Sequence, residues 1–277
     1  MAGPLTPEQA ACYRARGYLA PLPAFEPDET AAMRRRFEAL LAREGGVLSR
    51  ATNTRPHLLL PWIDEVIRDP RVLDPVESIL GPDILCWASG FFAKRPGDGA
   101  FVSWHQDATY WGLSSHEVVT AWIALTPSTP ETGCLRVLPG SHSRQLAHAD
   151  SFAPDNMLSR GQEVAVAVDE AEAAGIVLAA GEMSLHHVLI VHGSGPNRGG
   201  DWRIGLTVRY IPTHLRQQSP IRDSAMLVRG QDRYGHFEAE RRPAADFAPE
   251  AVAHHRAVQE RLNAITALGA RQPLRAR

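Results

Sequence analysis

The sequence predicts a mainly β protein, a barrel or sandwich with helices packed outside it. From Ile84 to about Tyr210, short apolar runs are separated by clusters of Gly, Pro, Ser and Asn. The runs are short and regularly spaced, and no helical segments alternate with them, which argues against βαβ units. Segments with helical spacing are confined to the two ends of the chain.

The N-terminal part reads as a mainly helical flank over residues 1–82. Thr6-Pro7-Glu8-Gln9 has the residue order of a capping box, which starts a helix. A second helix is expected from Pro27 to the glycine pair Gly45-Gly46. Apolar residues at helical spacing over 63–80 predict one or two further short helices.

The rest of the chain divides into a core and a cover. Residues 83–212 hold the predicted strands and are expected to form the barrel with its site. Residues 213–277 are expected to cover it and to end in a helix near Pro249–Leu268. Because neither an internal repeat nor a low-complexity linker interrupts the sequence, we expect one domain over 1–277.

The composition is that of an ordinary soluble protein and excludes several partner classes. The chain has 277 residues, of which 44% are hydrophobic and 22% charged, with a formal net charge of −2. No basic field therefore favours nucleic acid or an anionic membrane. Its three cysteines are scattered, and no apolar run is long enough to span a bilayer. We expect a cytoplasmic protein that acts on a small molecule, and the sequence leaves its oligomeric state open.

The segment Ser103-Trp104-His105-Gln106-Asp107 is the first candidate for a metal site. In a strand, side chains two residues apart point to the same face, so His105 and Asp107 would share one. A third ligand from a neighbouring strand would complete two histidines and one carboxylate, a set that leaves open positions on Fe(II). The H-x-D pattern is also compatible with a surface turn or a simple His–Asp pair.

A second candidate is His192, placed at the end of the apolar run MSLHHVLIV where Gly and Pro force a turn. A strand end suits a metal ligand, although this segment alone favours a turn histidine that caps local backbone groups. His186 shares the alternation of His192, but six residues of strand span about 20 Å. His186 and His187 are therefore interpreted as structural.

Residues 202–210 alternate with a period of two, which places Arg203 opposite Ile204, Leu206, Val208 and Tyr210. If the face of Arg203 lines a barrel interior, its guanidinium can bind a carboxylate through two hydrogen bonds. The alternative is a solvated outer face, and periodicity does not decide between them. Lys94 is expected to be a surface lysine whose charge stays in water.

Taken together, three segments resemble the phytanoyl-CoA dioxygenase family of Fe(II)/2-oxoglutarate oxygenases: SWHQDATYWGL, GCLRVLPGSH and HGSGPNRGGDWRIGLTVRY. The resemblance covers roughly residues 84–210, and the opening LTPEQ…GYL is also similar. The family pattern is H-x-D, a distal His in an H-G-S-x-P-N context and an Arg eleven residues later. It falls here on His105, Asp107, His192 and Arg203.

The resemblance implies a fold, cofactors and ligand roles. The fold is a double-stranded β-helix, a jelly-roll or cupin-like barrel, with flanking N-terminal and C-terminal helices. His105, Asp107 and His192 would hold Fe(II), which reacts with 2-oxoglutarate and O2. Arg203, together with Ser194, would bind the far carboxylate of 2-oxoglutarate.

The same resemblance implies hydroxylation of an unactivated C–H bond in a small polar metabolite, with release of succinate and CO2. Related halogenases carry Ala or Gly in place of the carboxylate ligand, so Asp107 favours hydroxylation. The flanking sequence is more similar to the bacterial small-metabolite branch, loosely to 2-aminoethylphosphonate-type hydroxylases. A halogenase or desaturase acting on a carrier-bound or free metabolite, and a non-catalytic metal-binding barrel, are the alternatives.

Candidate substrate contacts come from two places. Tyr110 and Trp111 directly follow the H-x-D segment and can wall a pocket. Arg55 and His57 lie in the polar stretch TNTRPH ahead of the barrel, a region that often covers the active site in the family. If the substrate is a phosphonate, Arg216 is a further candidate. Loop packing and ordinary loop polarity are equally compatible with all of these positions.

Overall fold

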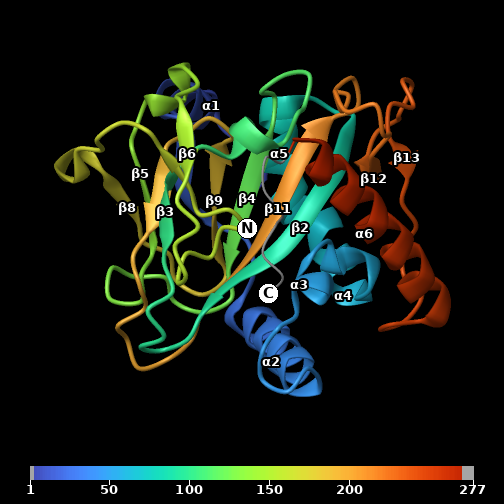
Figure 1. The fold of residues 1–277 in the computed structure, drawn as a ribbon, viewed down its shortest axis with the longest axis horizontal. Coiled ribbons are helices and arrows are strands. Elements are labelled where there is room, and N and C mark those ends of the chain that lie inside the picture. The colour runs from blue at the N-terminus through green and yellow to red at the C-terminus, as the bar shows by residue number, and fades with distance from the viewer. Residues whose placement is uncertain (1–2, 270–277) are drawn as a thin grey trace.

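Two sheets face each other and form a double-stranded β-helix (Figure 1). This computed structural model describes residues 3–269, apart from a few side chains, Tyr110 among them. The larger sheet has the strand order β1-β9-β4-β11-β2-β12-β13, the smaller sheet β3-β10-β5-β8, and β6 pairs with β7. The strands are β1 (Tyr18–Pro23), β2 (Ile84–Lys94), β3 (Val102–His105), β4 (Val119–Ala124), β5 (Leu135–Val137), β6 (His148–Asp150), β7 (Gln162–Val164), β8 (Ala174–Ile176), β9 (Glu182–His187), β10 (His192–Ser194), β11 (Arg203–Pro212), β12 (Ser224–Arg229) and β13 (Glu238–Ala239).

Helices α3 to α6 lie beside the larger sheet, on the side away from the smaller one (Figure 1). The capping box predicted at the start of the chain is present, because Thr6 and Gln9 exchange side-chain and backbone hydrogen bonds. None of the helices in the described residues combines the length and apolar character needed to cross a membrane. The α-helices are α1 (Pro7–Arg16), α2 (Pro27–Arg43), α3 (Arg50–Asn53), α4 (Pro61–Arg68), α5 (Pro70–Leu80) and α6 (Pro249–Gly269), and the short 3-10 helices are η1 (Pro56–Leu58), η2 (Asp107–Tyr110), η3 (Ser141–Ser143) and η4 (Glu170–Glu172).

The main core lies between these helices and the larger sheet, and it decides which face of β11 is inside the barrel. Ile204, Leu206 and Val208 are buried in the same cluster as helix residues such as Phe37. The Tyr210 hydroxyl donates to the backbone carbonyl of Ile67 in α4. Because these even-numbered residues face the helices, the odd-numbered residues of β11 face the smaller sheet. The face of Arg203 is therefore the barrel interior.

The larger sheet extends beyond the predicted barrel span of 83–212 in both directions. Strand β1 lies within the flank expected to be mainly helical and pairs with β9. Strand β12 follows residue 212 and pairs with β2. The sequence of β1, YLAPLP, contains two prolines, which a strand tolerates at the edge of a sheet. Such a short, proline-containing segment gives no clear strand pattern by itself.

Candidate metal centre

Two adjacent strands of the smaller sheet bring His105, Asp107 and His192 together. His105 ends β3 and pairs in register with His192, the first residue of β10. One potential ligand atom from each of the three residues lies within 4.8 Å of the others. His105 Nε2 and Asp107 Oδ1 are 3.4 Å apart. This is the one group of His, Cys, Asp and Glu in the described residues with the spacing to hold a metal ion.

Asp107 reaches this position from a turn, and the predicted strand alternation does not extend to it. Strand β3 ends at His105, and Asp107 begins the 3-10 helix η2. The residue between them, Gln106, is fully buried, and its side-chain amide donates to the carbonyls of Arg144 and Leu189. Gln106 therefore fastens the turn that directs Asp107 at the two histidines.

Backbone carbonyls orient both imidazole rings. Nδ1 of His105 lies 2.9 Å from the carbonyl of Ser103, and Nδ1 of His192 lies 3.0 Å from the carbonyl of Ile190. A ring that donates from Nδ1 to a carbonyl keeps the lone pair on Nε2 for a metal. The two ring centroids are 4.1 Å apart. The pattern is that of two metal-ligating histidines held by their backbone.

The protonation states also suit a divalent transition metal. Burial, reinforced by neighbouring His105, lowers the pKa of His192 to about 3. Burial raises the pKa of Asp107, but the hydrogen bond with His105 and the charges nearby outweigh it and hold that pKa well below its usual range. At neutral pH the site therefore presents a neutral imidazole at His192 and an ionised carboxylate. Two histidines and one carboxylate are the donor set of non-haem iron oxygenases.

Arg203 lines the same cavity as the three candidate ligands. Its side chain is 2% exposed, and its Nε and Nη2 have no hydrogen-bond partner. Its guanidinium carbon lies 5.3 Å from the centre of the Trp122 ring. Burial lowers the pKa of Arg203 to about 10, so the side chain stays charged at neutral pH. An unpaired buried cation costs several kcal/mol, so the cavity suits a bound anion.

Gly205 makes room for the aromatic ring beside Arg203. A Cβ atom at this position would lie 2.0 Å from Cζ2 of Trp122. We expect Gly205→Ala to shift Trp122, to lower the free energy of unfolding by about 1–3 kcal/mol and to weaken anion binding at Arg203. Chemical denaturation measures the first effect and ligand titration the second. Gly200→Ala is the control, because a Cβ there meets nothing within 4 Å. Equal stability of the two variants would contradict this packing role.

Lys94 is fully buried, so its expected place at the surface was wrong. It pairs with Arg203 across β2 and β11, and its Nζ donates to Ser194 Oγ at 2.7 Å and to the carbonyl of Gly195. Burial, together with the charge of Arg203, lowers the pKa of Lys94 to about 6. Because Ser194 Oγ accepts from Lys94, its own proton is available to an anion bound at Arg203.

His186 lies near the site, which the strand-length argument excluded. The run MSLHHVLIV is not one strand, since β9 ends at His187 within it and β10 begins only at His192, just after it. The chain turns between them, so the ring of His186 lies 5.4 Å from that of His192 and lines the same cavity. His186 Nδ1 is buried without a partner. His187 instead packs against His142, with ring centroids 5.2 Å apart.

Arg55 and His57 belong to a buried ion-pair cluster, which argues against their expected role as substrate anchors. Arg55 contacts Asp223 at 2.8 Å and Glu240 at 2.6 Å. His57 lies 3.1 Å from Glu240 and 2.7 Å from the hydroxyl of Ser89. Their acidic partners are more than 160 residues away in sequence, so no local pattern revealed the cluster.

The cluster predicts a pH-dependent contribution to stability. Burial raises the pKa of Glu240, but Arg55 and His57 outweigh it and lower that pKa from 4.5 to about 2. A lowered carboxyl pKa stabilises the fold above the unfolded value, and this contribution is lost as the pH falls from about 4.5 to about 2. We expect Glu240→Gln to cost about 3–5 kcal/mol near neutral pH and progressively less towards pH 2.

Urea unfolding of Glu240→Gln at several pH values measures this contribution. Glu238→Gln is a suitable control, because Glu238 is an exposed neighbour whose ion pair with Arg261 lies at the surface. A stability loss in Glu240→Gln that does not change with pH would contradict the cluster's electrostatic role.

The cavity that opens at Asp107, here called the mouth cavity, has a volume of about 380 Å³. Its walls include Ser89, Phe92, Asp107, Trp111, Leu158 and Arg209. Trp111 is thus placed where the sequence predicted a pocket wall. The side chain of Tyr110 lies outside the described part of the chain. Arg216 is exposed and does not line this cavity.

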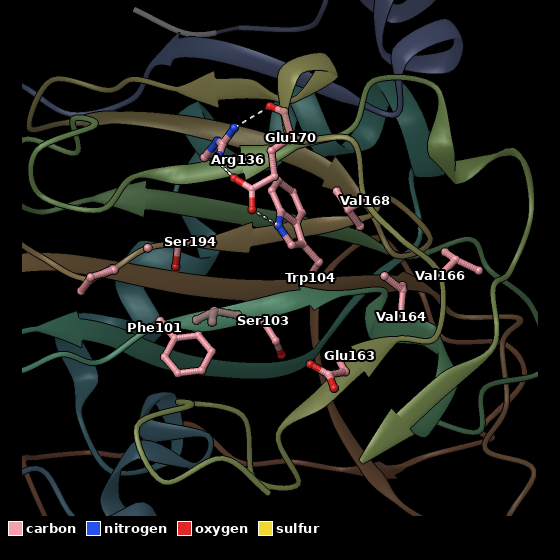
Figure 2. A pocket seen from close by; sticks show the side chains of 13 residues that line it. Phe101, Ser103, Trp104, Arg136, Glu163, Val164, Val166, Val168, Glu170 and Ser194 are labelled. Carbon is pink, nitrogen blue, oxygen red and sulfur yellow. Dashed lines mark hydrogen bonds and ion pairs between the residues drawn. The ribbon is translucent and has the colours of Figure 1, made fainter. Parts of the chain in front are cut away.

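A second cavity of about 560 Å³ lies on the outer face of the smaller sheet (Figure 2). Trp104 and Arg136 extend from this face toward Glu170, and the Trp104 indole and the Arg136 guanidinium both donate to its carboxylate. Trp104 precedes His105 in β3, so alternation places it on the opposite side from the metal ligands. Trp104 therefore faces away from the candidate metal centre, although Val102 and Ser194 line both this outer cavity and the cavity of the metal ligands.

A double-stranded β-helix that gathers two histidines, a carboxylate and a buried arginine defines a class, the 2-oxoglutarate-dependent non-haem iron dioxygenases. A profile of the phytanoyl-CoA dioxygenase family matches residues 13–205, and the chain belongs to that family.

Relatives and solved structures agree with this assignment. A probable alpha-ketoglutarate-dependent hypophosphite dioxygenase of Stutzerimonas stutzeri is 30% identical over 179 residues, 63% of this chain and 60% of that protein. An ectoine dioxygenase of Sphingopyxis alaskensis is 27% identical over 219 residues, 70% of this chain and 72% of that protein. The non-heme monooxygenase ThoJ superposes with a TM-score of 0.82 at 34% identity, over 95% of this chain and all of the other. The structure of CytC3 with Fe(II) and alpha-ketoglutarate superposes with a TM-score of 0.69 at 26% sequence identity, over 89% of this chain and 97% of the other.

Proposed function

We propose that this chain hydroxylates an unactivated C–H bond of a small polar metabolite, while 2-oxoglutarate is converted to succinate and CO2. The observation that carries the proposal is the cavity shared by His105, Asp107, His192 and Arg203, whose Nε and Nη2 have no hydrogen-bond partner. A metal-binding barrel without catalysis has no need for an unpaired buried arginine beside its ligands. A dicarboxylate that chelates the metal at one end and pairs with Arg203 at the other accounts for both the three ligands and the unpaired arginine.

Each residue then has a defined role. His105, Asp107 and His192 hold Fe(II), which with 2-oxoglutarate supplies the oxidising power for the reaction. Arg203 binds the distal carboxylate of 2-oxoglutarate, and Ser194 donates a hydrogen bond to the same group. Lys94 positions Ser194 through the contact at 2.7 Å. Arg203 and Ser194 bind and orient the cosubstrate in the cavity that they share with the metal ligands.

The carboxylate of Asp107 supports hydroxylation over halogenation. A halide needs a vacant metal position, and the Asp107 carboxylate, 3.4 Å from His105 Nε2, would occupy that position if it binds the metal. The overall reaction then inserts one oxygen atom of O2 into the C–H bond, and the other oxygen enters succinate. The mouth cavity gives the substrate access beside Asp107, and its volume of about 380 Å³ suits a small molecule.

A substrate screen tests the proposal directly. The protein is loaded with Fe(II) under anaerobic conditions and mixed with 2-oxoglutarate, O2 and candidate metabolites, with chloride present. We expect succinate release that one class of metabolite accelerates, and a product heavier by one oxygen atom in mass spectrometry. A chlorinated or desaturated product would favour the alternative oxidations. Complete absence of succinate with iron-loaded protein would favour a non-catalytic barrel.

A further inference from the structure

A second arginine lies inside the barrel on the same strand as Arg203. Arg209 belongs to the same interior face of β11, six residues further along, or about 20 Å of strand. Arg203 lines the cavity of the metal ligands but not the mouth cavity, whereas Arg209 lines both. The two guanidinium groups therefore serve different ends of the interior, and that of Arg209 is at the entrance.

Arg209 is held by an aromatic ring rather than by an acid. Its guanidinium carbon lies 5.0 Å from the centre of the Trp111 ring, a cation–π contact. Its Nε is buried without a hydrogen-bond partner. Among residues 3–269, the ion pairs within 4.0 Å include none with Arg209. The charge of Arg209 acts on the nearby Asp107 carboxylate without forming a direct ion pair with it, so the guanidinium N–H groups can pair with a further anion.

The charges around the mouth cavity also favour an anionic ligand. Asp107 is its acidic lining residue, and the proposed metal binding uses that carboxylate. Of the lining arginines, Arg55 is neutralised by Asp223 and Glu240, and Arg209 lies beside Asp107. With Asp107 bound to the metal in this proposal, Arg209 gives the cavity entrance a positive charge.

The rest of the wall suits a carbon skeleton. Trp87 and Trp111 pack with ring centroids 5.1 Å apart, and Phe92, Met157 and Leu158 also line the cavity. A molecule with an acidic head group at Arg209 would place its apolar part along this wall. Because Asp107 belongs to the same cavity, a C–H bond of that apolar part would lie beside the metal site.

We propose that Arg209, stacked on Trp111, binds the anionic head group of the substrate and makes small organic acids the substrate class. The shared chemistry is a terminal oxyanion, as in a carboxylate, sulfonate or phosphonate, bound by two guanidinium N–H groups. This inference rests on the proposed function for its meaning in catalysis, although binding of the acid can be measured separately.

The test compares acids with neutral molecules of the same shape. The probes are hexanoate with hexanamide and phenylacetate with phenylacetamide, and butylphosphonate is added as an acid with a different oxyanion. Binding to the anaerobic protein loaded with Fe(II) and 2-oxoglutarate is followed by tryptophan fluorescence, to which Trp87 and Trp111 contribute, and by the visible charge-transfer band. We expect at least one acid to bind about tenfold more tightly than its neutral partner.

Variants assign that preference to one side chain. Arg209→Gln is expected to weaken binding of the acid about 10- to 100-fold and to change binding of the amide little. Arg209→Lys should recover part of the affinity, because it restores the charge but not the two parallel donors. Arg216→Gln, an exposed arginine outside the cavity, is the matched control and should bind the acid as the wild type does.

Three results would overturn the inference. The first is a wild-type protein that binds no acid of the set more tightly than its neutral partner. The second is unchanged acid binding in Arg209→Gln. The third is an Arg209→Gln variant that loses affinity for 2-oxoglutarate instead of for the acids. If the charge-transfer band never forms, the proposed function fails, and fluorescence with the metal-free protein still decides between acid and amide.

Discussion

Replacing Arg203 with alanine is expected to raise the 2-oxoglutarate concentration needed for half-maximal turnover about 100-fold or more, while iron stays bound. Arg203 is 2% exposed and its guanidinium lacks hydrogen-bond partners for Nε and Nη2, so these donors are available to a ligand. Two charge-assisted hydrogen bonds contribute about 1.5–3 kcal/mol each. Arg203→Lys should fall between the wild type and the alanine variant, because it keeps the charge and loses the second donor.

Arg203→Ala weakens 2-oxoglutarate binding, but we do not expect it to destabilise the ligand-free protein. Without ligand, Arg203 is an unpaired buried charge, so removing it should leave the melting temperature unchanged or raise it. Added 2-oxoglutarate should then stabilise the wild type and have little effect on Arg203→Ala. Thermal unfolding of the iron-free and iron-loaded proteins, with and without 2-oxoglutarate, separates these contributions. An unchanged 2-oxoglutarate requirement in Arg203→Ala would show that another residue anchors the cosubstrate.

Replacing Asp107 with alanine is expected to remove both iron retention and turnover. The change leaves two histidine ligands and opens the position that the carboxylate fills 3.4 Å from His105 Nε2. Loss of an orienting partner alone typically costs 10- to 100-fold in metal affinity, so loss of a ligand should cost more than about 100-fold. Iron bound per chain after desalting, and succinate release, measure the two effects.

Glu170→Gln is the matched control for Asp107→Ala. Glu170 is a carboxylate on the outer face of the smaller sheet, where it pairs with Arg136, and its side chain is 61% exposed. It should therefore keep iron binding and turnover. His105→Ala should behave as Asp107→Ala does. An Asp107→Ala protein that retains iron as well as the wild type would place the metal elsewhere.

Motifs and alternation predicted the centre of the molecule well. The helical start at Thr6 and the alternation of β11 follow from local sequence. The H-x-D motif singled out His105 and Asp107, whereas their grouping with His192 came from the family resemblance. Local sequence sets which residues share a face of a strand, because side chains alternate. It does not set which of the two faces is inside, and the helices packed on Tyr210 and its neighbours decide that.

The residues that were misjudged depend on partners distant in sequence. Lys94 is buried because Ser194 and Gly195, 100 and 101 residues away, accept its hydrogen bonds. Arg55 meets Asp223 and Glu240 only after the C-terminal cover has folded against the barrel.

His186 shows the same limit at shorter range. A turn of a few residues, rather than a continuous strand, brings its ring to 5.4 Å from that of His192. Strand length is a reliable measure of distance only where the strand is unbroken.

The most direct test of the whole account is an anaerobic titration of the Fe(II)-loaded protein with 2-oxoglutarate, followed by its visible spectrum. The account predicts a charge-transfer band that saturates at one 2-oxoglutarate per iron and one iron per chain. It also predicts that the band is lost in His105→Ala and is shifted to far higher 2-oxoglutarate concentration in Arg203→Ala. Iron-loaded wild-type protein that gives no band, or a band indifferent to Arg203, would contradict the account.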